Sequence, residues 1–128
     1  MSDLNSIHNR AVWFDIPVAD LDRAAAFYAG VLALKVERAQ FDNFSFCVLE
    51  HGDGNGGCLV PNASEVTANA GILLYMNVNG RIRDAMNRVT ALGGKIVEPT
   101  HAIGPHGFRA VVLDSEGNRI ALHSPVDA

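Results

Sequence analysis

Two patterns of apolar residues recur along the chain, and each pattern occurs twice. Alternating apolar and polar positions, bounded by Gly, Asn and Asp, predict strands over residues 11–18, 34–39, 43–50, 57–61, 71–78, 95–98, 107–113 and 118–123. Apolar residues at helical spacing predict helices from Leu21 to Leu32 and from Ile82 to Leu92. Asp20 is a suitable N-cap for the first helix, and Gly93-Gly94 ends the second.

The two halves of the chain are related by a shift of 60 residues. Val12–Val18 aligns with Ile72–Val78, and at a shift of 61 the turn Asp53–Gly56 aligns with Asp114–Gly117. Each half therefore reads strand, helix and three strands, with module one at about 8–61 and module two at about 71–125. Neither half is large enough to be stable alone, so we expect one α+β domain over residues 1–128.

Several short motifs, in this order, resemble the vicinal oxygen chelate superfamily of glyoxalases, bleomycin-resistance proteins, fosfomycin-modifying transferases and extradiol dioxygenases. They are Phe14–Val18, Asp20-Leu21, Arg23-Ala24, Phe27-Tyr28, Gly57–Val60, Gly93–Lys95 and Asp114–Asn118. Two positions depart from the superfamily's pattern, Ser115 where Pro is usual and Asn79-Gly80 where an acidic pair is usual. The resemblance implies two tandem βαβββ modules that curve into one mixed-sheet cup, with the helices outside. It also implies a homodimer.

Strand alternation predicts which side chains face the cup and which face the helices. On the first strand, Trp13 and Asp15 face the cup, because the apolar residues alternate with them. The remaining cup positions are Leu73, Tyr75 and Asn77, then Arg119, Ala121 and His123. Because the repeat gives residues 72–78 the same alternation as residues 12–18, we expect Ile72, Leu74, Met76 and Val78 in the core. Matching the turns makes Cys58, Val60 and Asn62 the first-module equivalents of Arg119, Ala121 and His123.

The metal ligands that the resemblance implies, one on each of four strands, are replaced in this sequence. Carried over by position, they fall on Trp13, Val60, Leu73 and Ala121. None of these side chains binds a divalent metal, so we expect no metal and no other cofactor. This argues against glutathione-dependent glyoxalase chemistry, iron-dependent ring cleavage and metal-dependent fosfomycin transfer.

Four polar residues are predicted to share one layer of the cup, Asp15, Asn62, Tyr75 and His123. The catalytic hypothesis makes His123 the general acid or base, Asp15 its orienting partner and Tyr75 a hydrogen-bond donor. The expected ligand-binding residues are Trp13, Asn62, Leu73, His106 and Arg119. Two alternatives stay open, a polar layer that only stabilises the sheet and a displaced metal site at Asp15 and His123.

Composition narrows the function further. The 128 residues carry 10 basic and 14 acidic side chains, a net charge of −4 that disfavours nucleic acid as a partner. The polar N-terminus and the lack of a long apolar run predict a cytoplasmic protein without a membrane span. We therefore expect a glyoxalase-like protein that binds a small organic molecule, with metal-independent catalysis on that molecule as a hypothesis. The alternatives are a drug- or metabolite-sequestering protein of the bleomycin-resistance type and a metal-dependent lyase or dioxygenase with shifted ligands.

Overall fold

The computed structural model describes residues 11–128, and its elements follow the predicted order. The first module contains β1 (Trp13–Val18), α1 (Leu21–Leu32), β2 (Val36–Phe41), β3 (Phe44–Leu49) and β4 (Gly56–Pro61). The second contains β5 (Leu74–Asn77), α2 (Ile82–Ala91), β6 (Lys95–Ala102), β7 (Phe108–Leu113) and β8 (Arg119–Ser124). Short 3-10 helices cover Ala63–Glu65 and Gly104–His106. Residues 8–10, which the sequence assigns to module one, lie outside the described residues.

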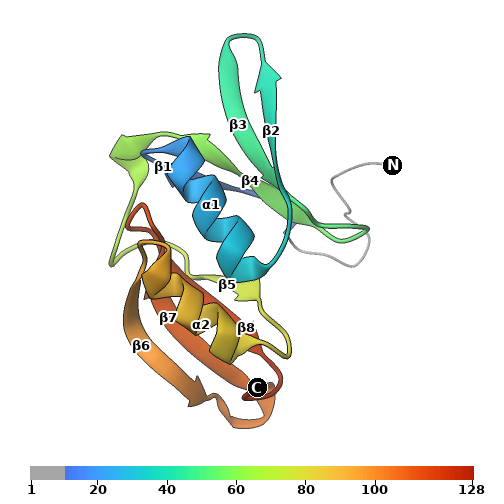
Figure 1. The fold of residues 1–128 in the computed structure, drawn as a ribbon, viewed down its shortest axis with the longest axis vertical. Helices are drawn as coiled ribbons and strands as arrows, with labels where there is room; N and C mark the ends of the chain where they lie inside the picture. The colour runs from blue at the N-terminus through green and yellow to red at the C-terminus, as the bar shows by residue number, and fades with distance from the viewer. Residues whose placement is uncertain (1–10) are drawn as a thin grey trace.

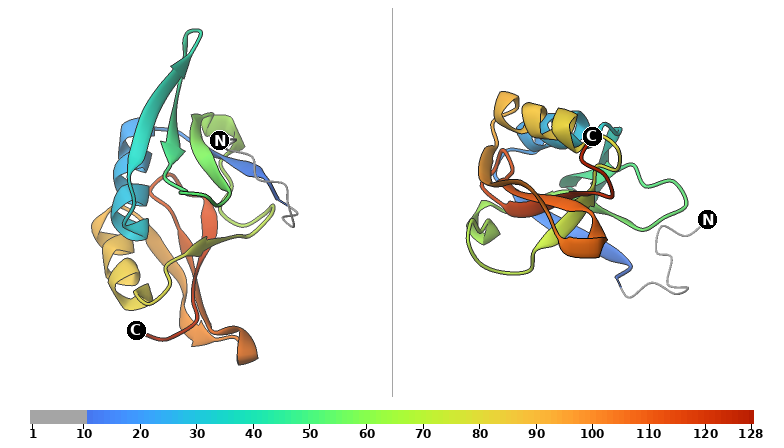
Figure 2. Two further views of the ribbon diagram at one scale, coloured as in Figure 1. Left: turned by 90° about the vertical axis from the view of Figure 1, so that its right-hand side faces the viewer. Right: turned by 90° about the horizontal axis from the view of Figure 1, so that it is seen from below.

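Each module forms its own four-stranded mixed sheet, and the two sheets have the same strand order. The orders are β1-β4-β3-β2 and β5-β8-β7-β6. In each module the first strand pairs in parallel with the last, and the other pairs are antiparallel. Both helices lie on the same side of the molecule, and the β2–β3 hairpin projects from the first module (Figures 1 and 2). The predicted α+β fold of two βαβββ modules is confirmed.

Most strand bounds differ from the prediction by one or two residues, and those of β5 and β6 differ by more. β2 begins at Val36, two residues later than predicted. β6 continues past residue 98 to Ala102, because Ala102 pairs with Phe108 at the start of β7. β5 begins only at Leu74, since its partner β8 supplies paired residues from 120 onward. Ile72, which we expected in the core, therefore lies before the strand and is 92% exposed.

Local sequence explains α1 well. The Asp20 side chain accepts a hydrogen bond from the Arg23 amide at 3.0 Å, as an N-cap does. The residues at helical spacing are buried against the sheets, and they are Leu21, Ala24, Phe27, Tyr28 and Val31. The helix ends at Leu32 because Ala33 adopts a left-handed conformation with φ 53°.

The N-terminus of α1 is capped a second time by a residue of the second module. Glu116 Oε1 accepts hydrogen bonds from the amides of Ala19 at 3.0 Å and Asp20 at 2.7 Å. Its carboxylate also accepts hydrogen bonds from Nε and Nη2 of Arg23, at 2.7 and 2.8 Å. A negative charge at a helix N-terminus is favourable, and this one has no exposed side-chain surface.

The C-terminus of α1 receives positive charge from α2. Arg81 Nη1 donates to the carbonyl of Val31 at 2.6 Å, and Arg88 Nη1 donates to the carbonyl of Gly30 at 3.4 Å. Asp84 pairs with both arginines and fixes their position. The second module thus stabilises both ends of α1 with the sign of charge that the helix dipole favours.

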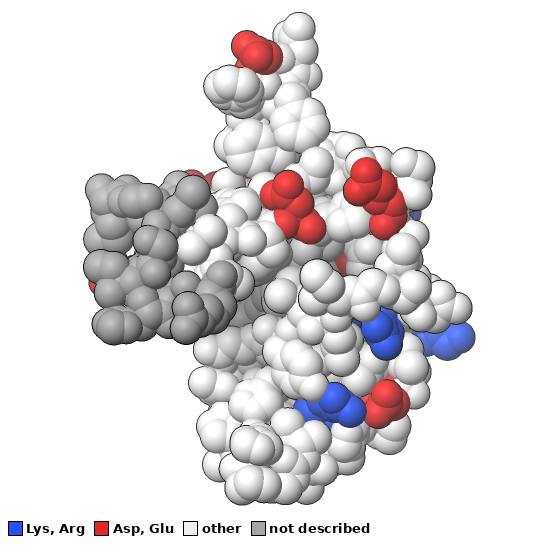
Figure 3. Space-filling model, turned by 180° about the vertical axis from the view of Figure 1, so that it is seen from behind, with Lys and Arg blue, Asp and Glu red and all other residues white. Residues whose placement is uncertain are grey.

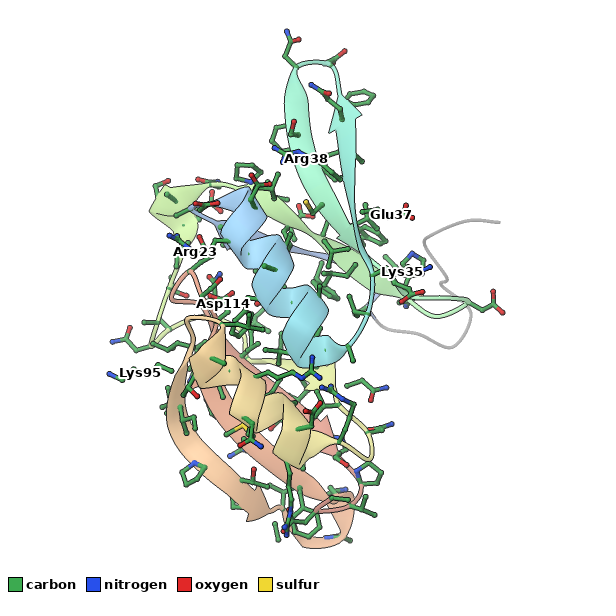
Figure 4. The ribbon with its side chains drawn as sticks, in the orientation of Figure 1. Arg23, Lys35, Glu37, Arg38, Lys95 and Asp114 are labelled. Carbon is green, nitrogen blue, oxygen red and sulfur yellow. The ribbon has the colours of Figure 1, made fainter. Side chains whose placement is uncertain are left out.

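Asp114 is a buried carboxylate at the junction of the two modules (Figure 4). Its Oδ2 accepts the hydroxyl of Tyr28 at 2.6 Å and the side-chain amide of Asn118 at 3.0 Å. Its Oδ1 accepts the backbone amides of Glu116 and Asn118. Burial and the neighbouring Asp114 carboxylate raise the pKa of Tyr28 well above its ordinary value. The turn motif that carries the resemblance is therefore a link between the modules.

The two cysteines are buried free thiols on opposite faces of the first sheet. Cys47 lies opposite Leu59, and Cys58 lies opposite Val48. Because Cys47 and Val48 are consecutive in β3, their side chains point to opposite faces. This arrangement does not suit a disulfide. None of the described helices has the length and apolar character that a membrane span needs.

Candidate functional site

A cavity of about 770 Å³ lies beside the second sheet. Side chains of β5, β7 and β8 line it together with the loop around the second 3-10 helix. Its lining is Tyr75, Met76, Asn77, Asn79, Ile103, His106, Arg109, His123 and Pro125. We call it the His123 cavity. It combines an apolar wall with a few polar groups, as small-molecule sites do.

A row of polar residues crosses all four strands of this module. His101 on β6 lies opposite Arg109 on β7, Arg109 lies opposite His123 on β8, and His123 lies opposite Asn77 on β5. The sequence did not assign Arg109 to a face. The β7–β8 hairpin could have assigned it. Leu113 pairs with Arg119, and counting back from this pair places Arg109 opposite His123.

The carbonyl of His106 orients the imidazole of His123. His123 Nε2 lies 2.7 Å from this oxygen, which can only accept, so Nε2 carries the proton. In the neutral ring, Nδ1 is then the nitrogen with a free lone pair. The loop fits here because the next residue is Gly107, with φ 93°, and an added Cβ would lie 2.6 Å from the Ser124 carbonyl. His106 therefore has the orienting role that we expected of Asp15.

Tyr75 and Arg109 form a second polar group in the His123 cavity. Tyr75 is 46% exposed, and its ring lies 6.4 Å from that of His123, centroid to centroid. Arg109 Nη1 donates to the Tyr75 hydroxyl oxygen at 2.5 Å. Arg109 Nε donates to His101 Nε2 at 3.3 Å. The structure thus brings together three predicted site residues, Tyr75, His106 and His123, and adds Arg109.

Asp15 and Arg119 line a different cavity, of about 340 Å³, to which Glu65 also contributes. Asp15 Oδ1 accepts the thiol of Cys58 at 3.1 Å. Within residues 11–128, no hydrogen bond or ion pair joins Asp15 to His123. The predicted pairing of these two residues is therefore not formed in this chain.

The register of the strands corrects the predicted equivalence of the last strands of the two modules. Asp15 pairs with Cys58, and Tyr75, its equivalent 60 residues later, pairs with Ala121. The equivalent of Cys58 is therefore Ala121, and not Arg119 as the alignment of turns implied. The last strands of the two modules are related by a shift of 63 residues, two more than predicted.

By the same register, the first-module equivalent of His123 is Val60, and not Asn62. Asn62 follows β4, where its amide donates to the Val18 carbonyl and its side-chain oxygen accepts the Ser64 hydroxyl. Asn62 directly precedes the 3-10 helix of the linker and does not line the His123 cavity. The expectation of Asn62 beside Tyr75 and His123 is therefore wrong.

Trp13 and Leu73 are half-buried and do not line the His123 cavity. The ring of Trp13 meets that of His51 edge-on, with centroids 5.7 Å apart. Cys58 lies nearby on the same sheet. Burial and the hydrogen bond to Asp15 raise the pKa of this thiol to about 11, so it is protonated at neutral pH.

The side chains present do not fit the metal site that the fold family implies. The positions Trp13, Leu73 and Ala121 offer no ligand atoms. The register makes Cys58, rather than Val60, the equivalent of Ala121, and it offers a single thiol, which donates to Asp15. In the part of the chain that the structure describes, no group of three or more His, Cys, Asp and Glu residues is arranged to hold a metal ion. We therefore derive no chemistry through a metal.

Comparison with known proteins agrees with this architecture. Residues 10–52 match the family model "Bleomycin resistance protein-like N-terminal". A hypothetical protein, SA1046, from S. aureus is similar in structure, with a TM-score of 0.72, 20% identity, and 91% and 94% of the two chains covered. A glyoxalase/bleomycin resistance protein/dioxygenase family enzyme from Burkholderia phytofirmans PsJN gives 0.68 at 18% identity, covering 88% and 95%. The chain has the glyoxalase/bleomycin resistance fold.

The fold extends to proteins of other kinds. The fosfomycin resistance protein FosX from Listeria monocytogenes matches with a TM-score of 0.69 and 14% identity, covering 92% and 94% of the two chains. No curated protein sequence matches the chain. The resemblance to the vicinal oxygen chelate superfamily is thus confirmed for the fold. Because this fold hosts many activities, function has to be argued from the site.

Proposed function

We propose that this protein binds a small organic molecule in the His123 cavity and transforms it without a metal. In this proposal His123 is the proton acceptor and Tyr75 is the hydrogen-bond donor. The observation that supports it most strongly is the contact of His123 Nε2 with the His106 carbonyl at 2.7 Å. It holds the ring in one tautomer and leaves Nδ1 available as a base.

The chemistry that suits this pair is proton transfer next to a polarised oxygen. A ligand proton would pass to His123 Nδ1, and the imidazolium would keep its Nε2–H bond to His106. The negative charge that develops on a ligand oxygen would be met by the Tyr75 hydroxyl, whose own oxygen is held by Arg109. Asp15 takes no part in this proposal, because it lies in the other cavity.

A deuterium-exchange assay tests the catalytic part. A panel of small aldehydes, ketones and 2-oxo acids would be incubated in D₂O with EDTA and followed by NMR. We expect wild-type protein to catalyse deuterium incorporation into at least one compound, and His123→Ala to lose this activity. Asn62→Ala is the matched control and should retain it. Exchange that requires added metal, or that survives in His123→Ala, would contradict the proposal.

Sequestration of a cationic drug is less well supported. A site for a cation needs carboxylates or open aromatic faces, and none of the described residues that line the His123 cavity is Asp or Glu. The phenol ring of Tyr75 already has Arg109 above it, 5.9 Å from the ring centroid. We therefore favour an enzyme over a drug-binding protein.

We also propose that two copies associate through the faces that the helices leave open. On this face acidic side chains lie over the first module, and most of the basic ones lie over the second (Figure 3). A two-fold axis could place the first module of each copy against the second module of its partner, so that acidic side chains would face basic ones. The projecting hairpin adds two exposed aromatic residues, Phe41 at 71% and Phe44 at 44%.

Light scattering coupled to size-exclusion chromatography tests the dimer. We expect a dimer at low salt that weakens as the salt concentration rises, and a monomer for the double variant Phe41→Ser and Phe44→Ser. A monomer at every protein concentration and salt concentration would refute the association.

A further inference from the structure

Among residues 11–128, the lining of the His123 cavity includes one guanidinium and no carboxylate. That cation is Arg109, whose side chain is 26% exposed. The remaining polar groups of the lining are neutral amides, a phenol and imidazoles. The other cavity differs, because Asp15 and Glu65 accompany Arg119 there. The two cavities should therefore prefer ligands of different charge.

Arg109 is held in place by three side chains. Its Nη1 donates to the Tyr75 oxygen at 2.5 Å, and its Nε donates to His101 Nε2 at 3.3 Å. His101 can accept there because its Nδ1 lies 2.8 Å from the Pro99 carbonyl and so carries the proton. Glu98 Oε1 approaches Nη2 at 3.8 Å, but this carboxylate is 52% exposed. Solvent screens an exposed carboxylate, so Glu98 cancels only part of the positive field in the cavity.

The contact with Arg109 also determines what Tyr75 can do. The phenol oxygen already accepts a hydrogen bond from a cation, so its own proton is free to be donated to a ligand. A charged donor polarises the O–H bond and makes it a stronger donor. The cavity thus offers an acidic hydrogen bond and positive potential at the same place.

We propose that Arg109, acting with Tyr75, makes the His123 cavity selective for anionic ligands, such as a carboxylate or enolate oxygen on a small apolar body. The inference rests on the proposed function, because it concerns the ligand of the same cavity. Met76, Ile103 and Pro125 provide the apolar wall for the ligand's body. Cations are rejected, because the guanidinium repels them and none of the described residues that line the cavity is a carboxylate.

Three nearly isosteric probes test this, namely benzoate, neutral benzamide and cationic benzamidine. Each would be titrated into the ¹⁵N-labelled full chain and followed by amide NMR shifts. We expect shifts around Tyr75, Arg109 and His123, and a Kd for benzoate about tenfold or more below that for benzamide, as a charge-assisted hydrogen bond gives. Benzamidine should not shift these residues.

Variants separate charge from shape. Arg109→Gln should abolish the preference for benzoate while benzamide binding stays within about twofold of wild type. Tyr75→Phe should weaken benzoate binding through loss of the O–H donor. Arg119→Gln is the matched control, since this arginine lines the other cavity and donates to the Gly71 carbonyl. It should leave the preference for benzoate unchanged. Thermal unfolding of each variant checks that it is folded.

The outcomes distinguish the two proposals. If the probes bind at the His123 cavity with equal affinity, or if Arg109→Gln keeps the preference for benzoate, the anion selectivity is wrong and the small-molecule site stands. If benzoate shifts only residues around Arg119, the selectivity is wrong for this cavity. If none of the three probes shifts residues of the His123 cavity, both proposals are overturned.

Discussion

Replacing Glu116 with Gln should weaken the link between the two modules. The carboxylate accepts the amides of Ala19 and Asp20, two nitrogens of Arg23 and the hydroxyl of Ser115. Gln has nearly the same shape but only one acceptor oxygen. The variant therefore loses the charge and leaves at least one donor of Arg23 or Ser115 without an acceptor.

The magnitude follows from the pKa of Glu116. Burial by itself would raise this pKa, but the hydrogen bonds from Arg23, Asp20 and Ser115 outweigh it and lower the pKa from 4.5 to about 2. That difference corresponds to about 3 kcal/mol of stability at pH 7. Because Arg23 is half exposed and partly screened by solvent, we expect Glu116→Gln to cost about 2–3 kcal/mol.

The pH dependence has a defined sign. A folded-state pKa below the unfolded value stabilises the protein above pH 4.5, and the gain is lost as the pH falls through about 2. Urea unfolding at pH 7 and pH 3 should therefore show a difference between wild type and Glu116→Gln that falls to less than half at the lower pH. Glu37→Gln, at an exposed position on β2, should show almost no difference at either pH. Equal stabilities of Glu116→Gln and wild type at pH 7 would refute the reasoning.

Three further predictions concern the core and the thiols. Tyr28→Phe removes a donor to the buried Asp114 carboxylate and should lower the free energy of unfolding by about 1–3 kcal/mol in urea titrations. Gly57→Ala should cost about 1–3 kcal/mol in the same assay, because the new Cβ would lie 2.4 Å from the carbonyl oxygen of Phe14; a stability equal to wild type would show that the strands separate easily. Cys58, whose pKa is raised to about 11 by burial and by its hydrogen bond, should resist iodoacetamide at pH 8 in the folded protein and react once urea unfolds it. Labelling of the folded protein at the unfolded rate, read by mass spectrometry, would contradict this.

Much of the fold could be predicted from the sequence because it depends on local signals. The N-cap at Asp20 and the apolar spacing of α1 act within one turn of helix. The repeat predicted the second module from the first. The prediction failed where the extent of a strand depends on its partner. Ile72 is exposed because the pairing of β5 with β8 starts only at Leu74. No local signal at Ile72 reports where β8, which begins 47 residues later at Arg119, starts.

The candidate site shows the same division between local and distant information. Alternation correctly placed Tyr75 and His123 on one face, and both line the cavity. The combination of Asp15 with His123 assumed that the two modules share one layer, whereas these residues line different cavities. Asp15 consequently contacts Cys58 rather than the imidazole.

The sequence by itself determined the two βαβββ modules, their helices and the polar residues available to a site, because periodicity and capping depend only on residues that are close in sequence. Only the tertiary structure decided which of those residues meet. The pairing of β7 with β8 brings Arg109 beside His123, and the packing of the 103–107 loop gives His123 a carbonyl partner in place of Asp15. Such contacts depend on strand register and on loop packing, and a shift of two residues preserves every apolar face while it changes the partners.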